Sequence, residues 1–231
     1  MSIAKTLNQD FFKTWTQEMA YVLGYFAADG SMLRNSRGAH FIEFTTTDRV
    51  LFTHIQKIVQ SNHKISTRQR KSVKWKTQYR LQIGSKEWFA DLEVLGFTQN
   101  KSSSLRFPKV PKKFFGDFVR GYFDGDGCVH FKEYWSKERK KNIWVFVTLF
   151  TSGSRSFLDT LHVKLLEYGI KGGRIGTKES GHDLVLSRHD SLALYRLMYH
   201  TAEVSDLYLP RKRGKLEEAI KVLKLGTYMR V

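Results

Sequence analysis

A nine-residue segment occurs twice in this chain of 231 residues, and the two copies lie 97 positions apart. VLGYFAADG occupies residues 22–30 and VRGYFDGDG occupies residues 119–127, with six of nine positions identical. Matching landmarks follow each copy in the same order: FTTTDRVLFTHI against FTSGSRSFLDTL, and then LRFP against LYLP. Because a repeat of this kind marks two copies of one structural unit, we expect two similar halves, residues 1–108 and 109–231. The short linker PKVPKKFF predicts that the halves pack as one unit.

Hydrophobic periodicity predicts an α+β fold in which each half runs helix, hairpin, helix, hairpin, helix. The first helix is indicated by apolar residues at helical spacing before Gly30, which is expected to end it as a left-handed cap. Strands are predicted where apolar and polar residues alternate, at residues 41–45 and 76–83. The second half repeats these patterns, but its first hairpin is longer and is expected to have a charged tip at residues 135–141.

The charge of the chain predicts a polyanionic partner. Thirty-nine Lys and Arg residues against 22 Asp and Glu residues give a net charge of +17, and residues 49–86 contain no acid at all. Nucleic acid is the first candidate, and a merely solvated basic surface is the alternative. No stretch approaches the roughly 18 to 20 apolar residues of a membrane span, and the start lacks a secretory signal. The single Cys128 excludes an intrachain disulfide and a thiolate-rich metal site.

The repeated segment places small residues and an acid at fixed positions of each predicted helix. Gly24 and Ala28 in one copy, and Gly121 and Gly125 in the other, form a groove on one helix face. If the helices cross at these grooves, the acids that follow, Asp29 and Asp126, arrive side by side. Helix C-termini repel anions, so two acids there indicate a cation, and a hard divalent ion with oxygen ligands fits. The alternative is an ordinary Asp-Gly helix end in each copy.

These paired segments resemble the signature of the LAGLIDADG homing endonucleases in their single-chain form with two motifs, and the resemblance covers nearly the whole chain. It implies that the two motif helices form the interface between pseudo-symmetric halves. It also implies that Asp29 and Asp126, with the backbone carbonyls of Ala28 and Gly125, hold Mg²⁺, a site that Mn²⁺ or Ca²⁺ could also occupy. The first motif has Ala27 where the second keeps Asp124. Because Asp124 has no acidic counterpart, we interpret it as a structural residue at the helix end.

The resemblance suggests further residues near the cleavage site. Asp48 and Ser154 fall where the family often places a water-ordering side chain at the start of the second helix. Lys101 resembles the family's basic residue near the scissile phosphate, although a solvated loop lysine is an equal alternative. In the second half Glu203 occupies the corresponding position, so no matching lysine is identified. We interpret the RKRGK run at residues 211–215 as a phosphate-contacting or solvated helix start.

Alternation also predicts which faces of the two antiparallel sheets form a DNA-binding saddle. Arg can bind guanine and Gln can bind adenine in the major groove, and either can instead contact a phosphate. The resemblance places the ends of the first strands at bases as well. The predicted DNA-binding residues are Asn35, Arg37, Glu43, Thr45, Ser66, Arg68, Arg70, Lys76, Gln78, Arg80, Gln82, His130, Lys132, Tyr134 and Lys178.

The function predicted from the sequence is metal-dependent, site-specific cleavage of both strands of a long, asymmetric DNA target. An RNA-splicing maturase, a non-cleaving DNA-binding protein of the same fold and a basic RNA scaffold are the alternatives, and retention of both acids favours the nuclease. We expect a soluble, intracellular monomer with no membrane partner, in a prokaryotic cytoplasm or an organelle matrix. A start at Met1 without a flanking protein-splicing segment indicates that this is not an intact intein.

Overall fold

The order of elements repeats between the two halves of the chain. The structure is a computed structural model that describes residues 5–68, 76–199 and 207–225. The first half contains α1 (Gln17–Asp29), β1 (Gly30–Arg34), β2 (His40–Thr46), α2 (Arg49–Ile58), β3 (Ile65–Arg68), β4 (Gln78–Gly84) and α3 (Lys86–Val94). The second half opens with a 3₁₀ turn (Lys112–Phe114) and continues with α4 (Phe115–Asp126), β5 (Gly127–Ser136), β6 (Lys141–Ser152), α5 (Arg155–Leu166), β7 (Arg174–Lys178), β8 (Gly181–Leu186), α6 (Arg188–Tyr199) and α7 (Pro210–Val222). The predicted α+β order is confirmed, and α7 is the helix whose start was expected at residues 211–215.

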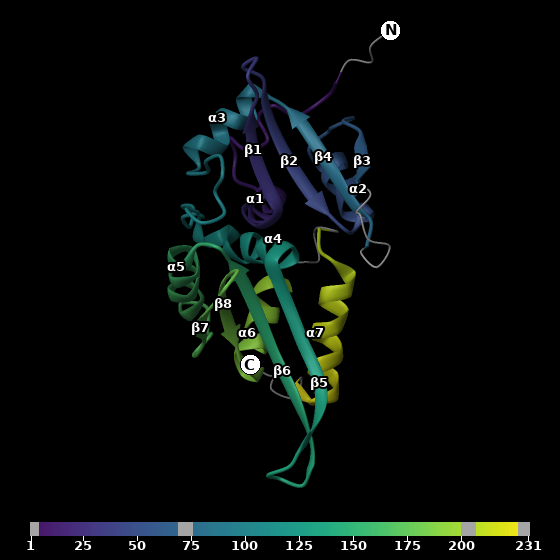
Figure 1. Cartoon of the computed structure of the whole chain (residues 1–231), viewed down its shortest axis with the longest axis vertical. Coiled ribbons are helices and arrows are strands. Elements are labelled where there is room, and N and C mark those ends of the chain that lie inside the picture. Colours follow the sequence, from purple (N-terminus) through teal and green to yellow (C-terminus); the bar gives the residue numbers. More distant parts are fainter. Residues whose placement is uncertain (1–4, 69–75, 200–206, 226–231) are drawn as a thin grey trace.

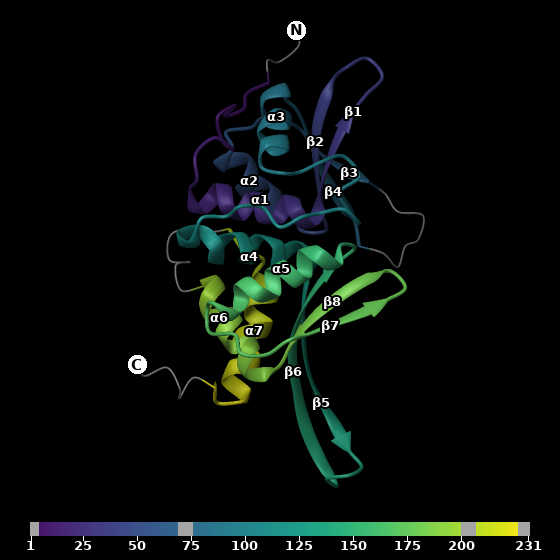
Figure 2. The same cartoon turned by 90° about the vertical axis from the view of Figure 1, so that its left-hand side faces the viewer.

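Each half holds one four-stranded antiparallel sheet with the same topology, β1-β2-β4-β3 and β5-β6-β8-β7. Both sheets lie on the same side of the molecule and the helices lie on the other (Figure 2). One face of each sheet packs on the helices. Phe44 of β2 pairs with Leu81 of β4, and the corresponding pair in the second sheet is Phe150 with Leu184. All four side chains are fully buried. The opposite faces remain open, as the alternation of apolar and polar residues predicts.

Helices α1 and α4 cross at the centre of the molecule, between the two sheets (Figure 1). A Cβ atom on Gly24 would collide with the carbonyl group of Phe118 and lie 2.9 Å from the backbone nitrogen of Tyr122. A Cβ atom on Gly121 would collide in the same way with Tyr21. The helix backbones therefore touch, which only glycine allows, and the predicted glycine interface is confirmed.

Gly30 does end α1, but not as the left-handed cap that the sequence suggested. Its φ of −95° and ψ of 157° are extended, and the backbone continues directly into β1. Gly127 ends α4 in the same conformation, with φ of −90° and ψ of 155°. A Cβ atom on Gly30 would collide with the ring of Phe26. Glycine is needed here because the aromatic ring fills the space beside the helix end, and not because of a positive φ.

The β5–β6 hairpin extends beyond the body of the second half (Figures 1 and 2). Ten residue pairs join β5 to β6, whereas five join β1 to β2. The connection between the paired ends Ser136 and Lys141 is short and charged, and Trp135 beside it is 63% exposed. The longer second hairpin with a charged tip is therefore confirmed.

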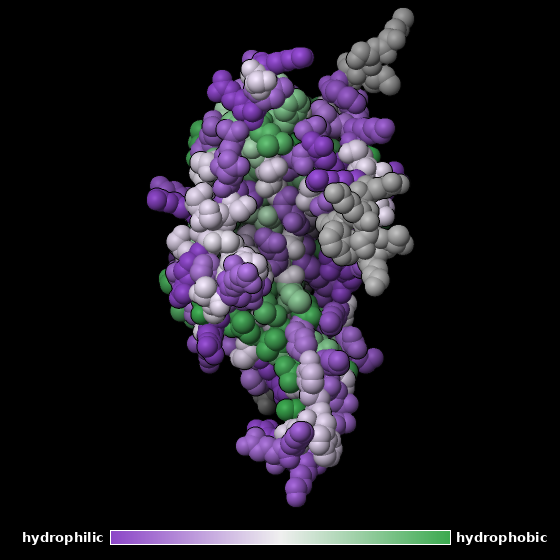
Figure 3. All heavy atoms as spheres, viewed as in Figure 1, coloured by the Kyte–Doolittle hydropathy of each residue, from purple (hydrophilic) through white to green (hydrophobic). Residues whose placement is uncertain are grey.

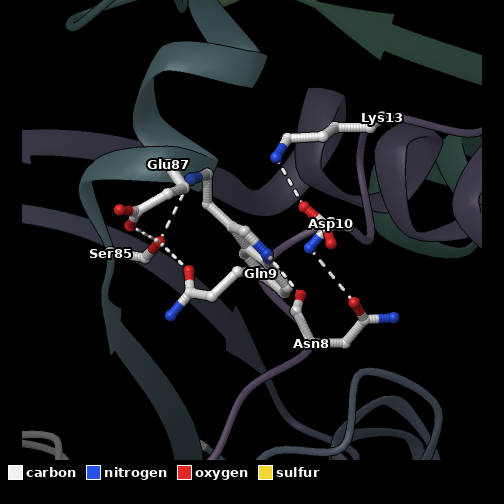
Figure 4. Close-up of polar contacts among 7 residues, drawn as sticks. Asn8, Gln9, Asp10, Lys13, Ser85 and Glu87 are labelled. Atoms are coloured by element: carbon white, nitrogen blue, oxygen red, sulfur yellow. Dashed lines mark hydrogen bonds and ion pairs between the residues drawn. The ribbon is translucent and has the colours of Figure 1, made fainter.

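The segment before α1 is fixed to the start of α3 (Figure 4). Ser85 caps α3 by accepting from the backbone nitrogen of Trp88, and its hydroxyl donates to the side-chain oxygen of Gln9 over 2.6 Å. The indole nitrogen of Trp88 donates to the carbonyl oxygen of Asn8 over 2.9 Å. These bonds join the segment before α1 to the start of α3.

Candidate active site

Asp29 and Asp126 lie at the ends of the two crossed helices, as the repeat predicts. Each is the last residue of its helix, and each is about half-buried. Asp29 Oδ2 lies 3.3 Å from the point where a Cβ atom on Gly125 would stand, so the carboxylate of α1 reaches the backbone end of α4. A Cβ atom there would also collide with Ala28, which shows how closely the two helix ends approach.

Both carboxylates are held at raised pKa values. Burial, and then repulsion by Asp126, raise the pKa of Asp29 to about 6, although Lys212 and Lys101 oppose the shift. Burial likewise raises the pKa of Asp126, and the same two lysines lower it in part. Two negative groups at the negative ends of two helices thus share a partly desolvated site. Such an arrangement is stabilised by added positive charge.

Two buried lysines supply part of that charge. Lys101 is 6% exposed, and its Nζ donates to the carbonyl oxygen of Ala27 over 2.8 Å. Lys212 is also 6% exposed, and its Nζ donates to the carbonyl oxygens of three residues of α4: Phe123 (2.6 Å), Asp124 (2.7 Å) and Gly125 (3.1 Å). Burial lowers the pKa of each lysine to about 8, and the nearby acids oppose this. Lys101 is therefore not a solvated loop lysine.

The two lysines occupy equivalent places in the two halves. Ala27 and Asp124, whose carbonyls they bind, are the same position of the repeated segment. Each ammonium also lies 5.5 Å from the ring centroid of the phenylalanine one residue earlier, Phe26 or Phe123. Lys212 is thus the counterpart of Lys101 that sequence matching did not find, and Glu203 lies outside the described residues. The available signal was the basic run directly after LYLP, whose interpretation as phosphate-contacting or solvated is wrong for Lys212.

Asp124 is a structural residue, as expected. It is 2% exposed, and its Oδ2 accepts from the hydroxyl of Tyr21 over 2.8 Å and from the backbone nitrogen of Leu209 over 2.9 Å. Burial raises its pKa to about 6, while Lys212 and these hydrogen bonds oppose the shift. Asp124 therefore joins α1, α4 and the start of α7, and its place in the first half is taken by Ala27, which leaves no counterpart.

Asp48 and Ser154 both precede a second helix, but they differ in what they contact. Ser154 is 2% exposed, accepts from the backbone nitrogen of Phe157 and donates to the carbonyl oxygen of Leu105 over 2.7 Å. Its hydroxyl is committed to capping α5, so the expected water-ordering role does not fit. Asp48 makes no side-chain cap bond with α2, so its carboxylate is available for other contacts.

The open face of the first sheet carries the predicted polar residues. Strand register puts Glu43 beside Gln82, Arg80 between Thr45 and Ser66, and Gln78 beside Arg68. Arg80 Nη2 lies 2.6 Å from Glu43 Oε2, so this arginine is partly neutralised. Lys76 is exposed just before β4. Arg70 lies outside the described residues.

Asn35 and Arg37 lie just beyond the end of β1. They form the turn between β1 and β2, where Asn35 Oδ1 accepts from the backbone nitrogens of Arg37 and Ala39. The Asn side chain thus shapes the turn, since short polar side chains bond readily to nearby backbone.

In the second half, β5 presents the predicted residues on one face. His130, Lys132 and Tyr134 alternate with buried Val129 and Phe131. The hydroxyl of Tyr134 lies 2.9 Å from His130 Nε2.

Lys178, at the end of β7, forms an ion pair of 2.8 Å with Asp183 of β8. All of these residues belong to the open side of the second sheet or its edge.

The donor atoms at the helix junction fit a hard divalent cation. Asp29 and Asp126 offer carboxylate oxygens, and the helix ends offer carbonyl oxygens, which are the ligands that Mg²⁺ prefers. The carbonyl of Gly125 already accepts a hydrogen bond from Lys212. Within the described ranges, no group of three or more His, Cys, Asp or Glu side chains is arranged to hold a metal ion, so this junction offers two carboxylates together with backbone carbonyls.

Together, these features define a pseudo-two-fold α+β protein with an acidic site at the junction of two crossed helices and two open sheets on one side. This is the homing endonuclease fold of the single-chain type. The sequence profile of the LAGLIDADG-like domain matches the chain twice, at residues 16–93 and 116–199. The chain belongs to this family. Each match falls inside one of the predicted halves.

Solved structures with a similar fold cover nearly the whole chain. The homing endonuclease I-WcaI bound to its DNA recognition sequence is 14% identical, with a TM-score of 0.58 over 90% of this chain and 91% of that one. Meganuclease I-SmaMI bound to uncleaveable DNA is 13% identical, with a TM-score of 0.61 and 90% coverage of both chains. LAGLIDADG meganuclease I-AabMI bound to uncleaved DNA is 14% identical, with a TM-score of 0.58 and coverage of 90% and 91%. At these identities the likeness shows a shared fold.

A curated relative shares more sequence over a shorter stretch. The probable translation initiation factor IF-2 of Thermococcus kodakarensis is 32% identical over 127 residues, or 53% of this chain. The match spans 9% of the length of that relative. Among the helices described, none has the length and apolar character needed to cross a membrane.

Proposed function

We propose that this chain is a site-specific DNA endonuclease that makes divalent-metal-dependent double-strand breaks at a long, asymmetric target. The observation that carries the proposal is the paired site itself: Asp29 and Asp126 at touching helix ends, each half with its own buried lysine. Each half thus contributes one acid and one lysine, which gives one such pair for each DNA strand. The family membership and the DNA-bound relatives of the same fold support this assignment.

The side chains at the helix junction would hold the metal ion and orient the groups around it. Asp29 and Asp126 would hold Mg²⁺, with backbone carbonyls of Ala28 and Gly125 as further ligands. When bound, the ion polarises the scissile phosphate, activates water and stabilises the leaving 3′ oxygen. Lys212 uses its three donors on three carbonyls, so it fixes the end of α4 and balances the acids. The ammonium group of Lys101 donates one hydrogen bond, to the carbonyl oxygen of Ala27, so two of its N–H groups remain for a phosphate oxygen or a water.

The open faces of the sheets would contact DNA. Arg68, Gln78 and Gln82 lie on one face of the first sheet, and these side chains match guanine and adenine in a major groove. The net charge of +17 supplies the general attraction to phosphates. Because the corresponding residues of the two sheets differ, the two halves of the target would differ as well.

Incubating the purified chain with a randomised DNA duplex library in Mg²⁺, and sequencing the cut ends, tests the proposal. We expect cleavage of both strands at one recurrent asymmetric site, no cleavage in EDTA, and none with Asp126→Asn, which should still bind. Sequence-specific binding without any cleavage would support the non-cleaving alternative. Binding that requires RNA would support the maturase alternative. Either result would overturn the proposal.

A further inference from the structure

The open faces of the two sheets differ in chemistry at equivalent positions. Buried pairs fix the equivalence, because Phe44 with Leu81 in the first sheet corresponds to Phe150 with Leu184 in the second. The neighbouring open-face pair in the first sheet is Glu43 with Gln82, which is polar. At the same place the second sheet has Leu149 with Val185, which is apolar.

This apolar pair belongs to a longer strip along the second sheet. Ile143, Val145, Val147 and Leu149 alternate along β6 and point to the same face, with Val185 beside Leu149. We call these five residues the apolar strip. Each is partly exposed, and none packs against the hydrophobic core of the described residues. Hydrophobic surface gathers over β6 in the space-filling view (Figure 3).

Cationic residues border the apolar strip. Lys132 of β5 pairs with Val145, and Arg174 of β7 pairs with Val185 on the same face. Val147, Val185, Arg174 and Lys178 line one hollow of the surface. Asp183 lines the same hollow and already pairs with Lys178. A partner that fits must therefore be apolar where it meets β6 and anionic where it meets Lys132 and Arg174. A DNA major groove offers both features, since thymine presents a C5-methyl group between two rows of phosphates.

We propose that the second sheet recognises thymine methyl groups, so that the half-site it contacts is selected for thymine at the positions facing the apolar strip. The inference rests on the proposed function, because it assumes that this face lies on DNA. It deepens that function by assigning different recognition chemistry to the two halves: amide and guanidinium groups in the first, and methyl contacts in the second. It also predicts discrimination against RNA, because uracil lacks the methyl group.

Uracil substitution in the DNA tests the proposal without any amino-acid substitution in the protein. A bound duplex is first selected from a randomised DNA library, and a photo-crosslinker on the single, exposed Cys128 identifies the half-site on the second sheet. Cys128 pairs with Leu149 on the same face, so the probe stands beside the apolar strip. Thymines of that half-site are then replaced by uracil, and the dissociation constant is measured. We expect binding to weaken about fourfold per methyl group removed, and less than twofold for uracil in the other half-site.

Two valine variants provide a matched comparison. Val185→Gln introduces the amide that Gln82 supplies in the first sheet, and should abolish the sensitivity to uracil. Val163→Gln, on an exposed position of α5 (61% exposed), should leave affinity and uracil sensitivity unchanged. Circular dichroism melting confirms that both variants fold.

Several results would overturn the inference. These are a second half-site without thymine, equal binding of the uracil duplex, or a dimer in sedimentation that Val185→Gln converts to a monomer, which would make the strip a contact between copies. Failure to select any DNA would instead overturn the proposed function, and the inference with it.

Discussion

Replacing Asp29 by asparagine should stabilise the metal-free protein while abolishing double-strand cleavage. Burial of the carboxylate, and then repulsion by Asp126, raise its pKa to about 6 from 3.8. Asparagine keeps the shape and an acceptor oxygen but has no charge. The variant thus removes the cost of burying a charge and a repulsion by Asp126, neither of which the unfolded chain has.

The magnitude follows from proton linkage. Each pKa unit corresponds to about 1.4 kcal/mol, so a shift of roughly two units destabilises the folded state by up to about 3 kcal/mol once Asp29 is ionised. Because the folded pKa is the higher one, this penalty is complete above about pH 6 and absent below about pH 4. Asp29→Asn should therefore exceed the parent in stability at pH 8, and the difference should shrink as the pH falls from 6 to 4.

Urea denaturation in EDTA at pH 8, 6 and 4 measures these differences, and a DNA nicking assay measures activity. Adding Mg²⁺ should reverse the order, because an ion that binds the folded parent stabilises it and the variant has lost a ligand. Asp159→Asn is the matched control, since that exposed residue of α5 forms only a surface ion pair and should change stability by less than about 0.5 kcal/mol. A variant that is less stable than the parent in EDTA at pH 8, or that cuts both strands at the parental rate, would refute the reasoning.

Three further outcomes are expected. Gly121→Ala should lower the free energy of unfolding by about 1 to 3 kcal/mol, because the new Cβ atom would collide with α1. Gly214→Ala, in open space on α7, should instead raise the free energy of unfolding by about 0.5 to 1 kcal/mol. Chemical denaturation of both variants measures these changes. Lys212→Met should lower the melting temperature more than Lys101→Met, because it removes a lysine hydrogen bond from three carbonyl oxygens instead of one. The five extra pairs of the β5–β6 hairpin add about 17 Å, so DNase footprinting should show protection extending about five base pairs further on the second half-site, and equal protection on both sides would contradict a role for the hairpin in binding.

Much of the architecture follows from local patterns in the sequence. The repeated segment predicts two equivalent helices that meet at Gly24 and Gly121, because small residues four apart leave one helix face open to close contact. The period-two alternation predicts the buried and open faces of β2 and β4, because successive strand residues must point to opposite sides. Paired Asp29 and Asp126 follow from the same repeat. Each of these features depends only on neighbours along the chain.

Lys212 shows what such patterns do not determine. The lysines of the two halves bind equivalent carbonyls, yet Lys101 precedes LRFP in the first half and Lys212 follows LYLP in the second. The two lysines thus reach equivalent carbonyl groups from different places in the chain. No regular spacing in the sequence predicts this. The conformation of Gly30 is a similar case, since the ring of Phe26 restricts it by packing.

The sequence by itself determined the repeat, the sheet faces and the paired acids, because each follows from the order of the residues or from the period of apolar and polar positions. Only the tertiary structure decided which lysines neutralise those acids. It also decided that Leu149 and Val185 stand where the first sheet has Glu43 and Gln82, because that equivalence depends on strand pairing between segments far apart in the chain.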